Sequence, residues 1–166
     1  MTVLPVLTWP DPRLGEVCAP VGRITPDIER LAADLLETMY AAPGRGLAGP
    51  QVGAMLRIFV MDAGWKSGTP SPVVMVDPEL LEASDEHATA SEGCLSLPGV
   101  LAEVTRPARV RMGWTALDGQ RREQDFDGFE ALCAQHELDH LDGRMTLDHL
   151  TPEARNRLLS EYGATP

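Results

Sequence analysis

Two histidines in this sequence stand four positions apart, and a glutamate directly follows the first of them. They are His136 and His140, with Glu137 between them, in the segment QHELDH. Residues four apart lie one turn from each other on the same face of a helix, so both imidazoles can reach one metal ion. The glutamate is close enough to exchange protons with a water molecule activated by that ion. The pattern therefore predicts a metal-dependent hydrolase site with Glu137 as its base.

A helix is expected to carry this motif. Apolar and histidine side chains recur at helical spacing from Phe129 to His140, after Asp127 and Gly128, which mark the helix start. Gly143 suits the end, because glycine adopts the left-handed conformation that often closes a helix. The histidines continue a mostly apolar stripe, so we expect a central, buried helix whose metal-binding face lines a cavity.

A catalytic metal site needs a third protein ligand and one open position, and the chain has three cysteines. The helical stretch from Cys133 to His140 spans about 10 Å, too far for three successive turns to meet at one ion. Cys133 is therefore interpreted as a small buried apolar residue and Cys18 as a structural one. Cys94 is the better candidate, because a glycine precedes it and Ser, Pro and Gly follow, as is typical of a loop or strand edge.

Three motifs together make the sequence resemble the peptide deformylases, from about Leu4 to about Leu150. They are GRGLAGPQVG at positions 44–53, EGCLS at 92–96 and QHELDH at 135–140, and they occur in the order found in that family. The resemblance implies an enzyme that removes the formyl group from the N-terminal formylmethionine of new proteins in bacteria and organelles. It also implies an α+β fold of the same outline as the elements predicted below.

The resemblance implies that Cys94, His136 and His140 bind one divalent metal ion. Members of the family use Fe²⁺ in the cell and often accept Zn²⁺, Ni²⁺ or Co²⁺. A mixed nitrogen and sulfur ligand set fits several of these ions, so the residues alone do not choose among them.

Further roles are implied for residues around the metal. Gln51 and the backbone N–H of Leu95 would stabilise the oxyanion, and Glu137 would act as general base and then as general acid. Gly46 would lie against the substrate backbone, where a side chain would obstruct the approach. The substrate-binding residues implied in this way are Gly44, Arg45, Gly46, Glu92 and Leu132. Glu92 is also expected to pair with Arg106, or else to be an exposed acid beside an exposed base.

Several positions depart from the family pattern, among them Leu101 and the Met145-Thr146 pair, and two departures lie in the glycine-rich motif. Gly49 stands where alanine is usual and is expected to loosen the loop that positions Gln51. Arg45 stands where an aliphatic residue commonly faces the substrate side chain. Its side chain either extends into solvent over the pocket rim, or shifts the substrate preference from methionine toward an acidic or more polar first residue.

Two other functions are compatible with parts of this sequence. A zinc-dependent peptidase could use the HExxH motif alone, but the cysteine motif and Gln51 favour a deformylase. A non-catalytic deformylase-like protein could keep the metal only for structure. Arg45 and Gly49 leave that alternative open, whereas the intact ligands and Glu137 oppose it.

Length and composition indicate one domain over residues 1–166 with an ordinary apolar content of 43%. The net charge of −11 argues against nucleic-acid binding, which needs clustered cations. Apolar runs such as Ile58–Met61 are too short to cross a membrane. The N-terminus lacks the pattern of a secretory signal. A cysteine that must be a thiolate in order to bind metal favours a reducing compartment. The cytoplasm is therefore the expected location.

The C-terminal segment bears on ribosome proximity, which the resemblance makes possible. A short helix is expected to start near Thr151 with Pro152 in its first turn. Only Arg155 and Arg157 supply positive charge there, which argues against docking to the ribosome through this tail. His149, just before it, is expected to be a surface or capping residue.

The remaining elements complete an α+β fold of antiparallel strands packed around a central buried helix, with an N-terminal helix and a short C-terminal helix. An amphipathic helix is expected from Thr25 to about Tyr40. Asp118-Gly119 predicts a hairpin turn between two strands. The expected strands lie near Met55–Asp62, Val73–Asp77, Val100–Val104, Ala108–Leu117 and Gln120–Phe126.

Overall fold

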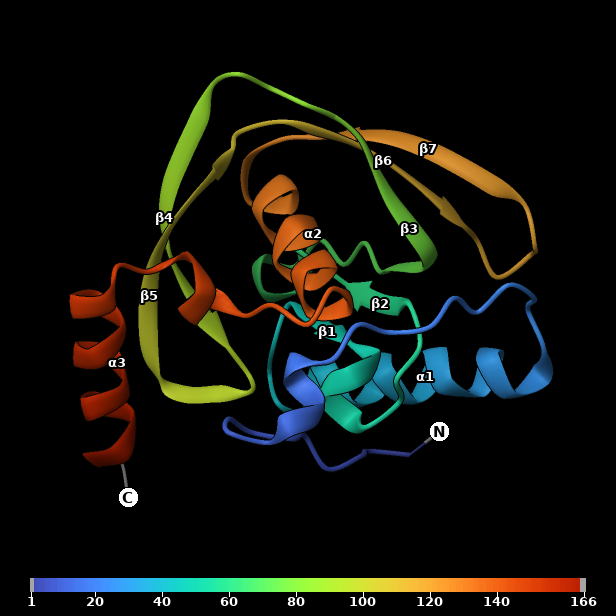
Figure 1. Cartoon of the computed structure of the whole chain (residues 1–166). Helices are drawn as coiled ribbons and strands as arrows, with labels where there is room; N and C mark the ends of the chain where they lie inside the picture. Colours follow the sequence, from blue (N-terminus) through green and yellow to red (C-terminus); the bar gives the residue numbers. More distant parts are fainter. Residues whose placement is uncertain (1, 165–166) are drawn as a thin grey trace.

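Helix α2 (Gly128–Leu141) runs through the middle of the molecule, and the other elements surround it (Figure 1). The computed structural model describes residues 2–164. The other elements in chain order are η1 (Pro12–Gly15), α1 (Pro26–Ala41), β1 (Gly46–Ala48), η2 (Gly49–Val52), β2 (Ile58–Met61), η3 (Trp65–Ser67), β3 (Val73–Ala83), β4 (His87–Cys94), β5 (Leu97–Pro107), β6 (Val110–Thr115), β7 (Arg121–Phe126), η4 (Thr146–His149) and α3 (Pro152–Ala164). Helices combined with antiparallel strands confirm the predicted α+β class.

The strands form two antiparallel sheets that enclose α2. One sheet has the order β1-β2-β3-β6-β7, and the other is the long hairpin β4-β5. Helix α2 packs against β1 and β2 of the first sheet and against β5 of the second. Helix α1 lies along β1 and β2, while α3 packs on β5 at the edge of the molecule (Figure 1). None of the helices within residues 2–164 has the length and apolar character needed to cross a bilayer.

Strand β2 packs against α2 on one face and against α1 on the other. Its four residues are all buried, and successive side chains of a strand point to opposite faces. Phe59 and Met61 join the apolar cluster that contains residues of α2, whereas Ile58 and Val60 join the cluster that contains residues of α1. A continuous apolar run is therefore required here, because neither face of the strand meets solvent.

Local signals set the helix ends as predicted. The Thr25 side chain accepts a hydrogen bond from the Ile28 N–H, and Pro26 occupies the first turn of α1. After α2, Gly143 adopts a positive φ of 73°, and a Cβ there would lie 2.7 Å from the Gly15 carbonyl oxygen. The chain leaving α2 can therefore pack against the N-terminal segment only if this residue is glycine.

Two strands were not anticipated. Strand β1 lies within the glycine-rich motif, and β4 carries a polar sequence with alternating exposed and half-buried residues. Strand β4 pairs with β5 along most of its length, and the register shifts between Glu92 and Cys94. Strands β3 and β5 also extend beyond the ranges expected from their apolar cores.

A buried carboxylate connects α1 to the segment beside the first motif. Asp62 is fully buried, and it accepts hydrogen bonds from the Tyr40 hydroxyl at 2.6 Å and from the backbone N–H of Ser71 at 2.9 Å. Its own N–H donates to the carbonyl of Arg45 at 2.9 Å. Burial, together with the hydrogen bond and negative charge of Asp62, raises the pKa of Tyr40 to about 12.

We predict that Tyr40→Phe destabilises the protein by about 1–2 kcal/mol at neutral pH, because the charge-assisted hydrogen bond is lost. The raised pKa means that the folded state retains the phenol proton longer than the unfolded state does. The contribution of Tyr40 is therefore present below about pH 10 and is lost as the pH rises toward about 12. Urea unfolding of both proteins across this range should show the difference shrinking; a constant difference would contradict the assignment.

Candidate metal centre and active site

Cys94, His136 and His140 come together although the cysteine is far from the histidines in sequence. Cys94 ends strand β4, and the two histidines lie one turn apart on α2. One potential ligand atom from each lies within 4.8 Å of the others, and the Cys94 Sγ is 3.5 Å from the His140 Nε2. Tetrahedral ligands with bonds of 2.0–2.3 Å stand about 3.3–3.8 Å apart, so a single small ion fits this group after slight contraction.

Glu92 orients the first histidine. The His136 Nδ1 is 2.9 Å from Glu92 Oε1, so an N–H donated there leaves the Nε2 lone pair facing the cluster. Burial opposes a charge on His136, but the nearby charge of Glu137 and contacts with Cys94 and Glu92 raise its pKa well above the usual value. A cation must therefore displace a proton from this ring when it binds.

The second histidine is held differently. His140 packs edge-on against His136 with ring centroids 5.1 Å apart, and its Nδ1 has no partner among residues 2–164. Burial and the positive charges of His136 and Arg106 lower the pKa of His140 well below the usual value. Its imidazole is thus neutral at pH 7, which is the form that a metal requires.

A buried ion pair supports Glu92. The Arg106 Nε and Nη2 donate to the two carboxylate oxygens at 2.7 and 2.9 Å, and the Arg106 side chain is only 3% exposed. Burial alone would raise the pKa of Glu92, but hydrogen bonds from His136 and Arg106 lower it to about 2. The predicted pairing is present, and the alternative of two exposed charges is wrong. Arg106 also donates through Nη1 to Asp139 on α2 at 2.9 Å.

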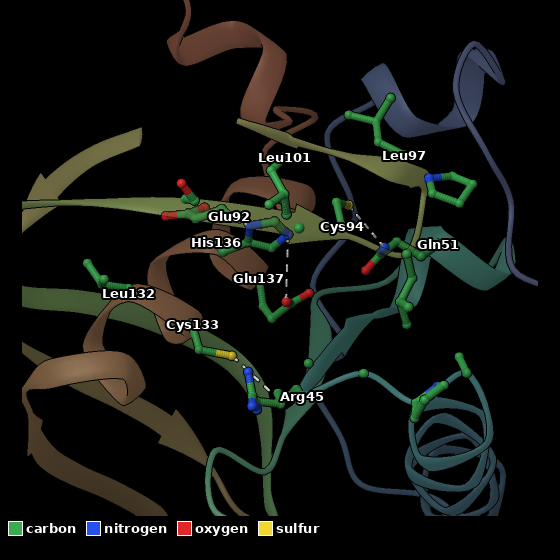
Figure 2. A pocket seen from close by; sticks show the side chains of 18 of the residues that line it. Arg45, Gln51, Glu92, Cys94, Leu97, Leu101, Leu132, Cys133, His136 and Glu137 are labelled. Carbon is green, nitrogen blue, oxygen red and sulfur yellow. Dashed lines mark hydrogen bonds and ion pairs between the residues drawn. The ribbon is translucent and has the colours of Figure 1, made fainter. Parts of the chain in front are cut away.

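Glu137 points into the same cavity (Figure 2). Its Oε2 lies 3.9 Å from the His136 Nε2, and its Oε1 has no hydrogen-bond partner within the described part of the chain. Burial is the main cause that raises the pKa of Glu137 to about 7, with the charges of Glu92 and Asp139 adding to it and those of His136 and Arg106 opposing it. A carboxyl group of this pKa can both take up and release a proton near neutral pH.

Gly46 is required by the glutamate rather than by the substrate backbone alone. A Cβ at this position would stand 2.5 Å from Glu137 Oε2 and 2.9 Å from its Cδ. The expected position of Gly46 against the substrate backbone stays a prediction, and within the fold an added Cβ would first meet the side chain of Glu137. Gly44 similarly faces Leu95, whose Cδ1 would lie 2.9 Å from an added Cβ.

Gln51 is fixed by two bonds, one of which involves a residue that the sequence did not single out. Its Oε1 accepts from the Ala48 N–H at 2.9 Å, so its Nε2 faces the cluster and lies 3.7 Å from the Cys94 Sγ (Figure 2). The Nε2 also donates to the hydroxyl of fully buried Ser96 at 3.0 Å. Ser96 follows the cysteine in the EGCLS motif, and only its nearness to Gln51 in the fold reveals this contact.

Gly49 fits closely into this turn, and the expected loosening of the loop stays a prediction. The residue is buried, and a Cβ there would lie 2.7 Å from the Ala54 carbonyl oxygen and 2.9 Å from that of Leu56. The glycine lets η2 pack tightly on the following segment. The backbone that carries Gln51 is therefore held by close contacts in this chain.

A cavity of about 710 Å³ opens beside these groups. It brings together all the predicted site residues except His140, which lies behind it in the metal cluster: Gly44, Arg45, Gly46, Gln51, Glu92, Cys94, Leu95, Leu132, His136 and Glu137. Arg45 is exposed at the rim, and its guanidinium lies over the Phe129 ring at 5.0 Å from the centroid. The Cys133 thiol lies beneath, 3.6 Å from the Arg45 carbonyl oxygen; burial keeps its pKa well above the usual value.

A thiol and two imidazoles within reach of one ion, beside a buried carboxyl group, are the groups of a metal-dependent hydrolase. Comparison with known proteins shows which family within this class of hydrolases the chain resembles. A family model described as polypeptide deformylase matches residues 3–156. The chain is 44% identical to peptide deformylase of Nitrobacter hamburgensis, covering 98% of this chain and 95% of that protein. It is 46% identical to peptide deformylase of Alkalilimnicola ehrlichii, covering 95% and 88%.

The fold agrees with these relatives. The crystal structure of peptide deformylase from Ehrlichia chaffeensis in complex with actinonin superposes with a TM-score of 0.92 at 33% identity, over 97% of this chain and 96% of that one. The chain belongs to the peptide deformylase family, whose members are metal-dependent hydrolases that release the formyl group from N-formylmethionyl peptides.

We predict that Gly46→Ala lowers kcat by about 100-fold, because a displaced Glu137 carboxyl group no longer meets the reacting atoms. Metal content should stay unchanged, since the three atoms nearest to the new methyl group all belong to Glu137 and not to a candidate ligand. Gly15→Ala is the matched control, because an added Cβ at Gly15 meets no atom within 4 Å. Equal kcat values for the two variants, measured on a formyl-methionyl peptide, would disprove the steric argument.

Proposed function

We propose that Cys94, His136 and His140 hold one divalent metal ion and that the protein uses it to hydrolyse the formyl group from N-formylmethionyl peptides of new proteins. The observation that carries this proposal is the grouping of one sulfur and two imidazole nitrogens within 4.8 Å at the floor of an open cavity. When bound, the ion acts as a Lewis acid on the formyl oxygen and the attacking water. Fe²⁺ is the proposed ion in the cell, and Zn²⁺, Ni²⁺ and Co²⁺ suit the same donors.

The proposed roles of the protein groups follow from where their atoms lie. The Glu137 carboxylate takes a proton from the attacking water and returns it to the departing amine, which its pKa of about 7 allows. The Gln51 Nε2 and the backbone N–H of Leu95 donate to the oxygen that becomes negative. Gln51 is suited to this because the Ala48 N–H occupies its oxygen and so leaves the amide nitrogen facing the cavity.

Substrate binding is proposed for Gly44, Arg45, Gly46, Glu92 and Leu132. Leu132 and Leu95 provide apolar surface in the cavity, which suits a methionine side chain. The main role proposed for Glu92 is to orient His136 and not to contact the substrate, because His136 and Arg106 already bind both of its carboxylate oxygens.

The proposed setting is the cytoplasm. All three cysteines are free, and Cys94 can bind metal only as a thiolate, which a reducing compartment preserves. We infer no ribosome docking through α3, because Arg155 lies 3.6 Å from Asp148 and the helix also carries acidic side chains. A net charge of −11 disfavours contact with nucleic acid.

The decisive experiment is formate release from formyl-Met-Ala-Ser by iron-loaded protein under anaerobic conditions. We expect turnover by the wild type and a loss of about 100–10,000-fold in Glu137→Ala, because the proton carrier is removed. Glu137→Ala should retain the metal, and exposed Glu153→Ala should behave as wild type. Absence of formate release from metal-loaded wild type would favour a non-catalytic protein, and cleavage of internal peptides such as casein would favour an HExxH peptidase.

The rim arginine gives a prediction on substrate preference. Because the Arg45 guanidinium lies on Phe129 and apolar side chains line the cavity beneath, we expect formyl-Met peptides to be preferred over formyl-Glu and formyl-Leu peptides. Arg45→Ala should change KM by only a few-fold and leave the order intact. Preference for formyl-Glu in the wild type, lost in Arg45→Ala, would instead show that this cation contacts the first side chain of the substrate.

A further inference from the structure

The ion pair behind the metal centre continues beyond Arg106. Glu92 contacts His136 on one side and Arg106 on the other, and Arg106 reaches Asp139 through its third nitrogen, Nη1, at 2.9 Å. Asp139 lies on α2 between the two histidines, and its carboxylate accepts a hydrogen bond from Arg106. One buried cation thus holds two carboxylates that come from different elements, β4 and α2.

His149, which is partly exposed, is the outermost member of this series of contacts. Its Nε2 lies 2.7 Å from Asp139 Oδ2, and its side chain is 20% exposed. The residue belongs to η4, a short turn that packs against β5. His149 is partly exposed in the last turn of η4, as expected of a surface or capping residue, and it is also tied to the carboxylate that contacts Arg106.

The hydrogen bond between His149 and Asp139 matters because other groups also lie near the Asp139 carboxylate. Oδ2 accepts from both Arg106 and His149, whereas the half-exposed Arg144 lies 3.9 Å from Oδ1. Without His149, the Asp139 carboxylate is free to turn toward Arg144 and solvent. Arg106 would then lose one of its two anionic partners, and the planar guanidinium that fixes both oxygens of Glu92 would be less well held.

We propose that His149 is a positioning residue for the metal centre, acting through Asp139, Arg106 and Glu92 on the orientation of the His136 ring. Outer partners of metal-binding histidines commonly change metal affinity or activity by 10–100-fold. His149 is several contacts from the ion, so its effect falls at the low end of this range. The inference rests on the proposed metal site, which it extends by a residue from η4.

The test uses the Co²⁺-loaded full-length protein with two amide substitutions of different reach. Glutamine can place its amide nitrogen where the histidine Nε2 lies, whereas asparagine is one carbon shorter and cannot. We expect His149→Asn and His149→Leu to lose Co²⁺ to a chelator about tenfold faster than wild type, with an altered visible spectrum of the bound ion. On a formyl-methionyl peptide, kcat should fall about tenfold while KM stays within about twofold. His149→Gln should restore wild-type values.

Controls separate positioning from general destabilisation. His87→Leu is the matched control, because His87 is an exposed histidine whose Nδ1 lies 2.8 Å from the Asp85 carbonyl oxygen. In an Asp139→Asn background, His149→Asn should have no further effect on Co²⁺ release, because the partner carboxylate is already gone. Should His149→Leu fail to fold, the comparison of asparagine with glutamine still decides.

Each outcome has a distinct meaning. Equal Co²⁺ release and kcat in wild type, His149→Asn and His149→Gln would overturn the role of His149 while leaving the proposed function intact. Additive effects of His149→Asn and Asp139→Asn would also overturn it, because His149 would then act by another route. Wild-type protein that neither retains Co²⁺ nor releases formate would instead refute the proposed function itself.

Discussion

The burial of polar side chains on α2 is the constraint on which the rest of the structure depends. Gln135, His136, Glu137 and His140 are all at least nine-tenths buried on one central helix. Isolated polar groups in an apolar interior destabilise a fold unless partners receive their hydrogen bonds and charges. The surrounding elements must supply those partners, so the arrangement of the hairpin β4-β5 around α2 follows from the chemistry of the helix.

The hairpin supplies most of these partners in a fixed order. Gln135 donates to the Pro107 carbonyl at 2.9 Å, His136 contacts Glu92, and the Cys94 Sγ faces His140. The adjacent residues Gln135 and His136 thus meet the end of β5 and β4 near its end, and His140, one turn further along the helix, meets the cysteine. Glu92 and Cys94 are two residues apart on β4, so both side chains lie on the same half-buried face of the strand and can reach the helix. The alternation of side chains along β4 therefore helps to set the geometry of the candidate ligands.

This dependence explains what could and could not be predicted from the sequence. The two histidines were predicted as a pair because helical periodicity fixes residues four apart. The helix ends at Thr25 and Gly143 were predictable for the same local reason. Contacts across elements, such as Gln51 with Ser96 or His149 with Asp139, have no local signal. Strand β4 was missed because it alternates polar residues on a half-exposed face instead of the apolar pattern that identifies a buried strand.

Two departures from the family pattern, Arg45 and Gly49, stand in the glycine-rich motif. Gly49 packs against backbone carbonyls, and Arg45 lies on an exposed aromatic ring at the rim. Neither contacts the candidate ligand atoms, and the buried series from His136 to Arg106 is complete beneath them. A buried charge network tolerates little change because removal of one member leaves the others uncompensated, whereas a rim side chain can change at small cost. A substitution of Arg45 at the rim therefore removes no member of the buried network from His136 to Arg106.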